Sequence, residues 1–229
     1  MNLDKLEKLI SYEFKNKDLL KEALTHRSYL NENPKWYLPH NERLEFLGDA
    51  VLELAITESL YEQFPKESEG KLTTLRAALV NYQMLAGLSK QISLERFLLM
   101  SRGEAKDTGR AREVILANAM EALIGAIYLD ADFKQVKSFV LKFIFPEINE
   151  VLQKGLDRDP KSLLQEWSQA NLKITPVYKL LNEKGPDHKK IFIVGVYFGK
   201  EEIAQGQGLS KQDAEVEAAQ KALASKDIL

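Results

Sequence analysis

The most informative stretch of this 229-residue chain reads Asn41-Glu42-Arg43-Leu44-Glu45-Phe46-Leu47-Gly48-Asp49-Ala50-Val51-Leu52. Its carboxylates Glu42, Glu45 and Asp49 stand at i, i+3 and i+7, so they share one face of a helix. Leu52 and Ile56 lie on that same face, and the opposite face is apolar as well, with Leu44, Leu47, Val51 and Leu54. A helix that is apolar on both sides is predicted to be buried. Like charges on a buried helix repel one another and lose hydration, so a cation must offset them, and a divalent metal ion is the obvious candidate.

Composition narrows the classes of protein that this chain can belong to. A hydrophobic content of 45% is enough for real cores, and the length fits one large domain or two ordinary ones. The chain has no cysteine and only three histidines, which excludes disulfides and thiolate metal sites and disfavours a zinc enzyme. Because the net charge is only −2, any nucleic-acid site must be local.

The apolar runs of the sequence indicate where the protein is located in the cell. None approaches the roughly 18 residues that span a bilayer. The beginning, Met1-Asn2-Leu3-Asp4-Lys5-Leu6-Glu7-Lys8, alternates in charge instead of forming a signal-peptide core. We therefore expect a cytoplasmic protein without a membrane segment.

Two domains are expected, the first of them all-α. From residue 3 to about 153 the apolar period is helical, and it predicts helices over residues 18–30, 41–64, 70–92 and 113–129. The first domain is assigned to residues 1–154 and a linker to 155–159. At the end of the linker, Asp159 and Pro160 supply an N-cap and a first-turn proline for a helix over residues 161–170.

The second domain, residues 160–229, is predicted to be a small α+β domain. After Pro176 the apolar period changes to two, which predicts strands over residues 177–181, 191–198 and 202–205. We interpret residues 206–211 as a turn that leads to Ser210, the N-cap of a helix over residues 210–224. The expected order is α-β-β-β-α.

A second apolar helix, over residues 114–129, holds only two strongly polar side chains in its middle, Asn118 and Glu121, at i and i+3. If that face packs against Glu45 and Asp49, four oxygen-bearing side chains converge, a set that suits Mg²⁺ or Mn²⁺. An acidic site without a His or Cys nucleophile fits metal-assisted hydrolysis of a phosphoester, in which the metal orients and activates a water molecule.

A purely structural interpretation remains open for several of these residues. The acids of residues 42–49 could be a solvated helix face, although a lone Glu121 within an apolar helix is rarely buried without a partner. Glu69 is either an outer carboxylate of the site or an ordinary loop acid. His26 is interpreted as a core histidine and not as a metal ligand.

The second domain offers groups that could hold a nucleic acid. Free N–H groups at the start of the helix after Ser210, beside Lys211, can receive a phosphate. Further polar candidates lie before a strand and on the first helix of the domain: Lys189, Lys190, Gln165 and Glu166. Two such contact zones suit duplex RNA, whose shallow minor groove exposes 2′-hydroxyls. The alternative is a generic α/β domain with surface lysines.

These motifs resemble bacterial ribonuclease III over essentially the whole chain. The stretches that carry the resemblance are residues 23–29, 41–52, 115–130 and 159–223. The resemblance implies an all-α endonuclease domain followed by a double-stranded-RNA-binding domain. It also implies a homodimer that uses Mg²⁺, for which Mn²⁺ can substitute, to cut double-stranded RNA and leave 5′-phosphate and 3′-hydroxyl ends. The substrates it implies are ribosomal RNA precursors and some messenger and transfer RNAs.

Residue roles are carried over from the family position by position. The implied metal ligands are Glu45, Asp49, Asn118 and Glu121, and the catalytic set is Asp49, Glu121, Glu45 and Glu42. Glu42 and Glu69 match supporting acids near the cleavage site, and Phe46 matches a dimer contact. The residues expected to touch RNA are Gln165, His188 and Lys211, with Lys189 and Ser210 beside them.

Two departures from the family pattern bear on activity. Asn118 stands where the family most often has Asp, which predicts retained activity with weaker metal affinity, and Gln212 replaces a frequent lysine. Asn118 also keeps open a duplex-RNA-binding protein with impaired catalysis. A third possibility, an all-α phosphohydrolase of small nucleotides, leaves the second domain unexplained.

Overall fold

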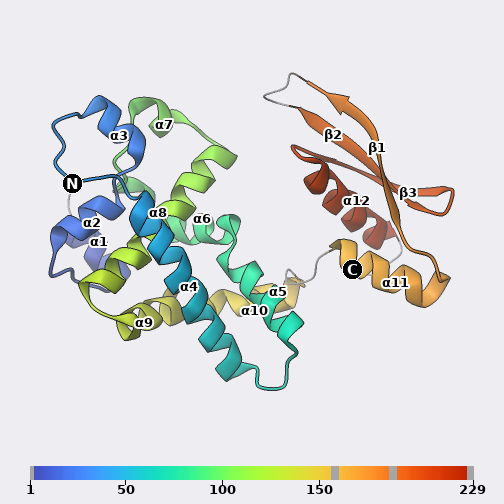
Figure 1. Cartoon of the computed structure of the whole chain (residues 1–229), viewed down its shortest axis with the longest axis horizontal. Coiled ribbons are helices and arrows are strands. Elements are labelled where there is room, and N and C mark those ends of the chain that lie inside the picture. The colour runs from blue at the N-terminus through green and yellow to red at the C-terminus, as the bar shows by residue number, and fades with distance from the viewer. Residues whose placement is uncertain (1–2, 156–159, 186–189, 226–229) are drawn as a thin grey trace. The chain divides into compact units, whose positions relative to one another are not determined.

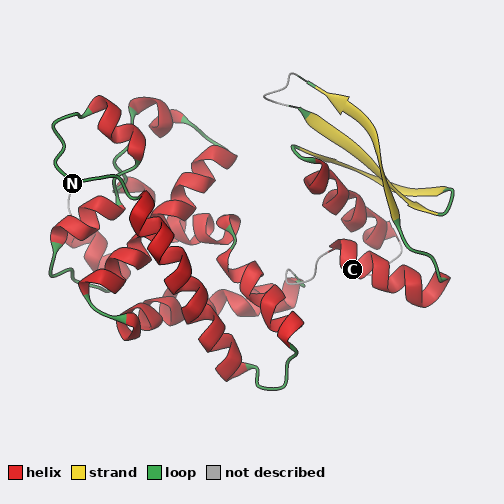
Figure 2. Ribbon diagram, in the orientation of Figure 1, coloured by secondary structure: helices red, strands yellow, loops and turns green. Residues whose placement is uncertain are grey.

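The computed structural model describes residues 3–155, 160–185 and 190–225. The chain divides into two compact units, Met1–Asp157 and Arg158–Leu229. Figure 2 shows that the first unit is built from helices and that the second adds strands, so the predicted fold class is confirmed. Most of the predicted linker, residues 156–159, lies outside the described residues, as does the predicted N-cap Asp159.

The N-terminal unit consists of helices joined by short connections (Figure 1). Its α-helices are α1 (Leu3–Ile10), α2 (Lys17–Ala23), α3 (Arg27–Glu32), α4 (Glu42–Gln63), α5 (Glu69–Val80), α6 (Tyr82–Gln91), α7 (Arg102–Lys106), α8 (Arg110–Asp130), α9 (Phe133–Phe143) and α10 (Ile148–Lys154). Short 3₁₀ turns lie at η1 (Leu94–Arg96) and η2 (Phe145–Glu147).

The long helices α4 and α8 lie at the centre of this unit and cross each other in direct contact (Figure 1). Helix α8 is apolar around its circumference, so its middle forms part of the core. From residue 116 to residue 127 every residue is buried except Asn118 and Glu121, which are half-buried. Asn118 and Glu121, the two polar residues identified from the sequence, are therefore the only residues of this stretch whose side chains are partly accessible to solvent.

The predicted helix over residues 18–30 is wrong in its middle, because the chain leaves the helix at Leu24 and re-enters one at Arg27. Thr25 forms a parallel bridge with Leu99. The backbone N–H of Leu99 donates to Leu24 O at 2.8 Å, and the N–H of His26 donates to Leu99 O at 2.9 Å. A backbone partner more than 70 residues away thus replaces the local helical hydrogen bonds.

The predicted helix over residues 70–92 is likewise two helices, α5 and α6, with Asn81 between them. The Asn81 side chain accepts a hydrogen bond from the backbone N–H of Met84 at 2.9 Å, so it caps α6. An asparagine that caps a helix takes an extended backbone conformation, which ends the preceding helix.

The expectation that α4 is buried on both sides is wrong. One stripe of the helix faces outward, with Phe46 82%, Leu54 56% and Tyr61 73% exposed. These side chains recur at positions that share a single helix face. Isolated exposed apolar residues are ordinary, whereas a row of large ones marks a surface that contacts another molecule.

The C-terminal unit has two helices on one face of a three-stranded antiparallel sheet with strand order β1-β2-β3. Its elements are α11 (Pro160–Leu172), β1 (Val177–Lys184), β2 (Ile191–Phe198), β3 (Glu201–Gly208) and α12 (Lys211–Ser225). Its core joins Leu164 of α11 and Phe198 of β2 to the alanine-rich inner face of α12. The predicted element order is confirmed, although β1 and β3 extend further than expected.

The prediction of a turn over residues 206–211 is wrong for its first half, because Gly206 and Gly208 belong to β3. A Cβ at Gly206 would lie 2.2 Å from Ala214 O of α12, and one at Gly208 would lie 2.5 Å from Ala214 N. Glycine is therefore needed here for the close approach of a strand to a helix and not for a turn. The predicted cap is present, since Ser210 Oγ accepts from Asp213 N at 3.0 Å.

Candidate metal and nucleic-acid sites

The candidate metal site lies where α4 and α8 cross backbone to backbone. A Cβ on Gly48 would lie 1.7 Å from Glu121 O, and a Cβ on Gly125 would lie 2.3 Å from Leu44 O. Only glycine at both positions permits this approach. Since Gly48 stands between Glu45 and Asp49 in the sequence, the crossing brings the acids of α4 against the backbone of Glu121.

The electrostatics of the side chains show that the predicted ligands lie within reach of one another. Burial, together with the charges of Asp49 and Glu45, raises the pKa of Glu121 to about 8. Burial also raises the pKa of Glu45, as do Glu42 and Asp49, while a hydrogen bond with Asn118 acts in the opposite direction. Glu45, Asp49, Asn118 and Glu121 therefore come together from two helices.

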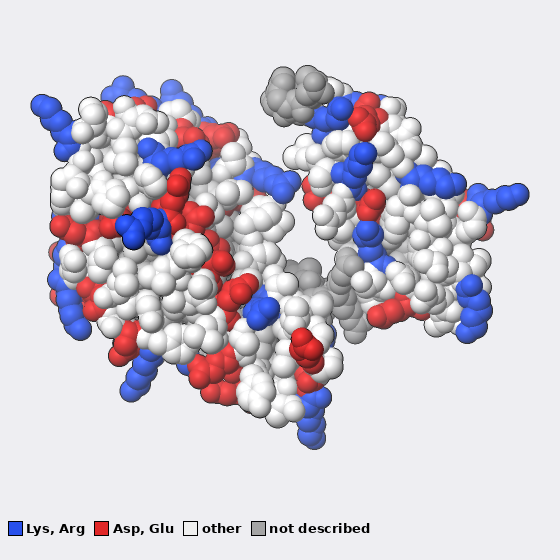
Figure 3. Space-filling model, viewed as in Figure 1, with Lys and Arg blue, Asp and Glu red and all other residues white. Residues whose placement is uncertain are grey.

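This cluster holds negative charge without a cation of its own. The causes of the raised pKa of Glu121 are burial and two carboxylates, and none of them is a cationic side chain. Acidic side chains follow the line of α4 across the visible face of the unit (Figure 3). Two or more carboxylates in one half-buried place are expected either to retain a proton or to bind a cation.

The donor set fits a hard divalent cation in chemistry. It offers three carboxylates and one amide oxygen and no nitrogen or sulfur ligand, which is the set that Mg²⁺ and Mn²⁺ prefer. In the described part of the chain, no group of three or more His, Cys, Asp or Glu side chains lies close enough together to coordinate a metal ion.

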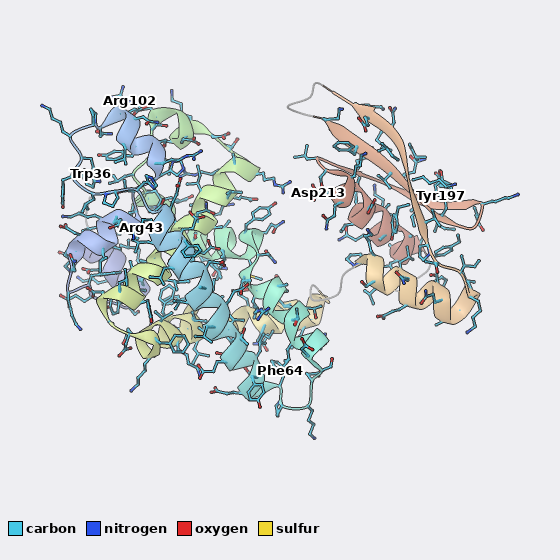
Figure 4. The ribbon with its side chains drawn as sticks, in the orientation of Figure 1. Trp36, Arg43, Phe64, Arg102, Tyr197 and Asp213 are labelled. Atoms are coloured by element: carbon cyan, nitrogen blue, oxygen red, sulfur yellow. The ribbon has the colours of Figure 1, made fainter. Side chains whose placement is uncertain are left out.

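Glu42 makes its contacts outside this cluster. Its carboxylate lies 3.6 Å from Nη1 of Arg27 and 3.8 Å from Nδ1 of His40. Both contacts are long, and the one with Arg27 is between exposed side chains, so they hold Glu42 only weakly. Arg43, labelled in Figure 4, lies near Glu22 of α2, where it partly offsets the rise in the pKa of Glu22 that burial causes.

His26 has a structural role in agreement with the sequence interpretation. It precedes α3 as its N-cap, and its Nδ1 lies 2.8 Å from Ser28 Oγ and 3.3 Å from Ser28 N. Burial lowers the pKa of His26, which favours the neutral imidazole that can accept from the backbone.

Glu69 does not lie with the four predicted ligands in a single chain. It is the first residue of α5 and lines a groove of about 440 Å³ beside Thr57, Tyr61 and Arg76. Thr57 stands eight residues beyond Asp49 on α4, which at 1.5 Å per residue corresponds to about 12 Å along the helix. Phe46 points away from the core on the exposed stripe of the same helix.

The predicted RNA contacts of the C-terminal unit are only partly described. Gln165 is exposed on α11, and Lys211 is exposed at the start of α12. Lys190 Nζ lies 2.9 Å from Glu183 Oε2. The start of α12 also carries Asp213, labelled in Figure 4. His188 and Lys189 lie outside the described residues.

Sequence reasoning missed Gly48 and Gly125 as residues of this site. The available signal was their position, since a glycine inside a well-formed helix costs about 0.5–1 kcal/mol relative to alanine and needs a reason. Each lies in the interior of a long helix, directly after a large apolar residue, Leu47 or Ile124, and an interior glycine of this kind has a packing or functional reason.

The helical first unit and the α+β second unit define a ribonuclease-III-like nuclease domain followed by a double-stranded-RNA-binding domain. The family described as Ribonuclease-III-like matches residues 16–148, and the double-stranded RNA binding motif matches residues 160–226. The protein named Ribonuclease 3 from Nitratiruptor sp. is 44% identical over 221 residues, with 96% of this chain and 95% of that protein covered. Ribonuclease 3 from Borreliella burgdorferi is 45% identical over 221 residues, with 96% and 90% covered.

A solved structure shows the same likeness for the first unit. The nuclease domain of ribonuclease III from Campylobacter jejuni is 46% identical, with a TM-score of 0.58, and the match covers 63% of this chain and 97% of that one. The chain belongs to the ribonuclease III family, and the expected enzyme class, ribonuclease III, is confirmed. None of the helices in the described residues combines the length and apolar character that crossing a membrane requires.

Proposed function

We propose that this protein is a divalent-metal-dependent endoribonuclease that hydrolyses phosphodiester bonds in double-stranded RNA and leaves 5′-phosphate and 3′-hydroxyl ends. The observation that carries the proposal is Glu121, a half-buried carboxylate whose pKa is raised to about 8 beside Asp49 and Glu45. A strongly raised pKa among carboxylates marks a place where a bound cation would take over from the proton, and the matched RNA-binding motif supplies the substrate class.

In this proposal Glu45, Asp49, Asn118 and Glu121 hold Mg²⁺, or Mn²⁺ in its place. The bound ion would activate a water molecule and neutralise charge on the phosphate at the transition state. Glu121 must lose its proton to take part, because only the carboxylate is a ligand. Asn118 contributes an amide oxygen without a charge, so we expect weaker metal affinity than with Asp at this position. Glu42 supports the site from its exposed place at the start of α4.

We extend the proposal to a homodimer formed through the exposed stripe of α4. Phe46, Leu54 and Tyr61 present a row of apolar surface that a two-fold axis near Leu54 would bury against itself. Phe46 of one copy would then lie near Tyr61 and the groove that Glu69 lines in the other copy. In this arrangement Glu69 of one copy would support the metal site of the other copy. It lies too far from the metal site of its own copy, because about 12 Å of helix separates Thr57, beside Glu69, from Asp49.

The C-terminal domain would hold the duplex through Gln165 at the minor groove and through Ser210 and Lys211 at a phosphate. His188 and Lys189 complete the proposed contacts. Gln212, in place of a lysine, would remove about one phosphate contact and reduce the salt dependence accordingly. Ribosomal RNA precursors and some messenger and transfer RNAs, in the cytoplasm, are the substrates that we propose from the resemblance.

One assay tests the proposed reaction. The wild-type protein and Glu121→Gln are incubated with a long duplex RNA, with single-stranded RNA and with nucleotides, each with Mg²⁺ or with EDTA. We expect the wild type to cut only the duplex and only with Mg²⁺, and the variant to bind the duplex without cutting it. Cutting that persists in EDTA, or that prefers single strands, would refute the proposal.

The second candidate is a duplex-RNA-binding protein with impaired catalysis, and Asn118 is the feature that favours it. In that case the wild type would bind the duplex and leave it intact at every Mg²⁺ concentration, and Asn118→Asp would restore cutting. An all-α phosphohydrolase would instead consume the nucleotides.

A further inference from the structure

We infer that Gly48 and Gly125 are positioning residues that set the affinity of the site for its metal ion, because their contact fixes the spacing between the acids of α4 and those of α8. The inference rests on the proposed metal-dependent function. It concerns residues that contact neither metal nor RNA, and it follows from how closely two backbones approach.

The contact is reciprocal, and each glycine meets the backbone of a proposed ligand or of the residue next to one on the other helix. Gly48 faces the backbone of Glu121, where a Cβ would lie 1.7 Å from the carbonyl oxygen. Gly125 faces Leu44, the residue before Glu45, where a Cβ would lie 2.3 Å from the carbonyl oxygen. The obstacles are backbone atoms inside long helices and not the ends of flexible side chains, so only movement of a whole helix can relieve them.

The required movement exceeds what a metal site tolerates. Ordinary van der Waals contact of a Cβ begins at 3.4 Å, so an alanine would force the backbones apart by about 1.7 Å at residue 48 and about 1.1 Å at residue 125. Metal–oxygen distances in a working site hold within about 0.2 Å, and Mg²⁺ demands nearly ideal octahedral geometry. Either substitution should therefore spread the ligands beyond the reach of one ion.

The chain supplies a matched control for the substitution itself. Gly87 lies within α6, and a Cβ there meets nothing within 4 Å. Gly87→Ala therefore makes the same chemical change in a helix of the same unit without touching the crossing. Leu6→Ala, at a fully buried position in α1, serves as a second control that lowers the melting temperature without altering the crossing.

The experiment measures Mn²⁺ binding to the full-length protein without RNA, from the electron paramagnetic resonance signal of free Mn²⁺. We expect the dissociation constant to rise about 10- to 100-fold in Gly48→Ala, a loss of the size seen when groups that orient metal ligands are removed. Gly125→Ala should lose less, because its overlap is smaller, and Gly87→Ala and Leu6→Ala should bind as the wild type does. Circular dichroism, from the helix content and the thermal unfolding transition, establishes that each variant is folded.

The outcomes separate this inference from the proposed function. If the wild type binds no Mn²⁺ and cuts no duplex, the proposed function fails. If the wild type binds and cuts while a folded Gly48→Ala binds Mn²⁺ equally well, the positioning role is refuted and the function stands. If Leu6→Ala weakens Mn²⁺ binding as much as Gly48→Ala, or if both crossing variants fail to fold, the glycines serve the fold alone and the inference is withdrawn.

Discussion

Glu121→Gln should stabilise the metal-free protein at the same time as it abolishes cleavage. The wild-type carboxyl has a pKa of about 8 in the fold and a reference value of 4.5. A raised pKa means that the folded state binds the proton more tightly than the unfolded chain does. Stability from this group is therefore greatest below about pH 4.5 and declines as the pH rises to about 8. Glutamine has nearly the same shape and carries no charge at either pH.

The size of the effect follows from the shift. A change of roughly 3.5 pKa units at 1.36 kcal/mol per unit gives a ceiling of about 5 kcal/mol. Glu121 is only half-buried and can relax toward solvent, so we expect about 2–3 kcal/mol above pH 8. For a unit of this size, each kcal/mol moves the melting temperature by about 2–4 °C. The variant should thus melt about 4–12 °C higher than the wild type at alkaline pH.

The assay is thermal unfolding of both proteins in EDTA at about pH 5 and about pH 8.5. These values lie below and above the pKa of Glu121 in the folded protein. We expect similar melting temperatures at the lower pH and a higher value for Glu121→Gln at the higher pH. Saturating Mg²⁺ should raise the melting temperature of the wild type alone, since a ligand stabilises only the protein that binds it.

Glu53→Gln is the matched control, because Glu53 is an exposed acid on the same helix as Asp49. It makes the same chemical substitution outside the cluster and should leave the melting temperature unchanged at both pH values. Equal melting of Glu121→Gln and the wild type at alkaline pH would show that Glu121 is not strained by its neighbours, and the argument for a cation site would lose its main support.

Four further predictions address the other residues. Asn118→Asp should lower the Mg²⁺ concentration needed for half-maximal cleavage, because it adds a charge to the ligand set; equal requirements in a Mg²⁺ titration would contradict this. Phe46→Asp should give monomers in sedimentation at unchanged helix content, since the side chain is 82% exposed, and a persistent dimer would place the contact elsewhere. Lys211→Ala should reduce the slope of log affinity against log salt by about 0.9, measured with duplex RNA in EDTA, and an unchanged slope would exclude a phosphate contact. Gly206→Ala should cost the C-terminal domain about 1–3 kcal/mol or more of folding free energy, and an unaltered urea unfolding transition would show that β3 can move away from α12.

Much of the fold could be predicted from the sequence because periodic patterns are local. The helical spacing of Glu45 with Asp49 and of Asn118 with Glu121 placed each pair on one helix face before any contact was known. The change of period after Pro176 fixed the order of elements in the second domain, and Ser210 was identified as a cap from its own neighbours. In each case the relevant hydrogen bonds or faces lie within a few residues, so neighbouring residue types suffice to determine them.

Tertiary structure decided everything that depends on a distant backbone. Leu99 breaks the helix at Thr25, and pairing with Val194 and Phe192 of β2 makes Gly206 and Gly208 part of β3, because these contacts join groups that are not neighbours in the sequence. The exposed stripe through Phe46 also escaped the pattern, since an apolar residue looks the same in sequence whether it faces the core or a partner surface. The distance between the acidic side chains also depends on tertiary structure. The sequence placed Glu45 and Asp49 on one helix and Glu121 on another, and only the crossing of the two helices at Gly48 determined how close these carboxylates come.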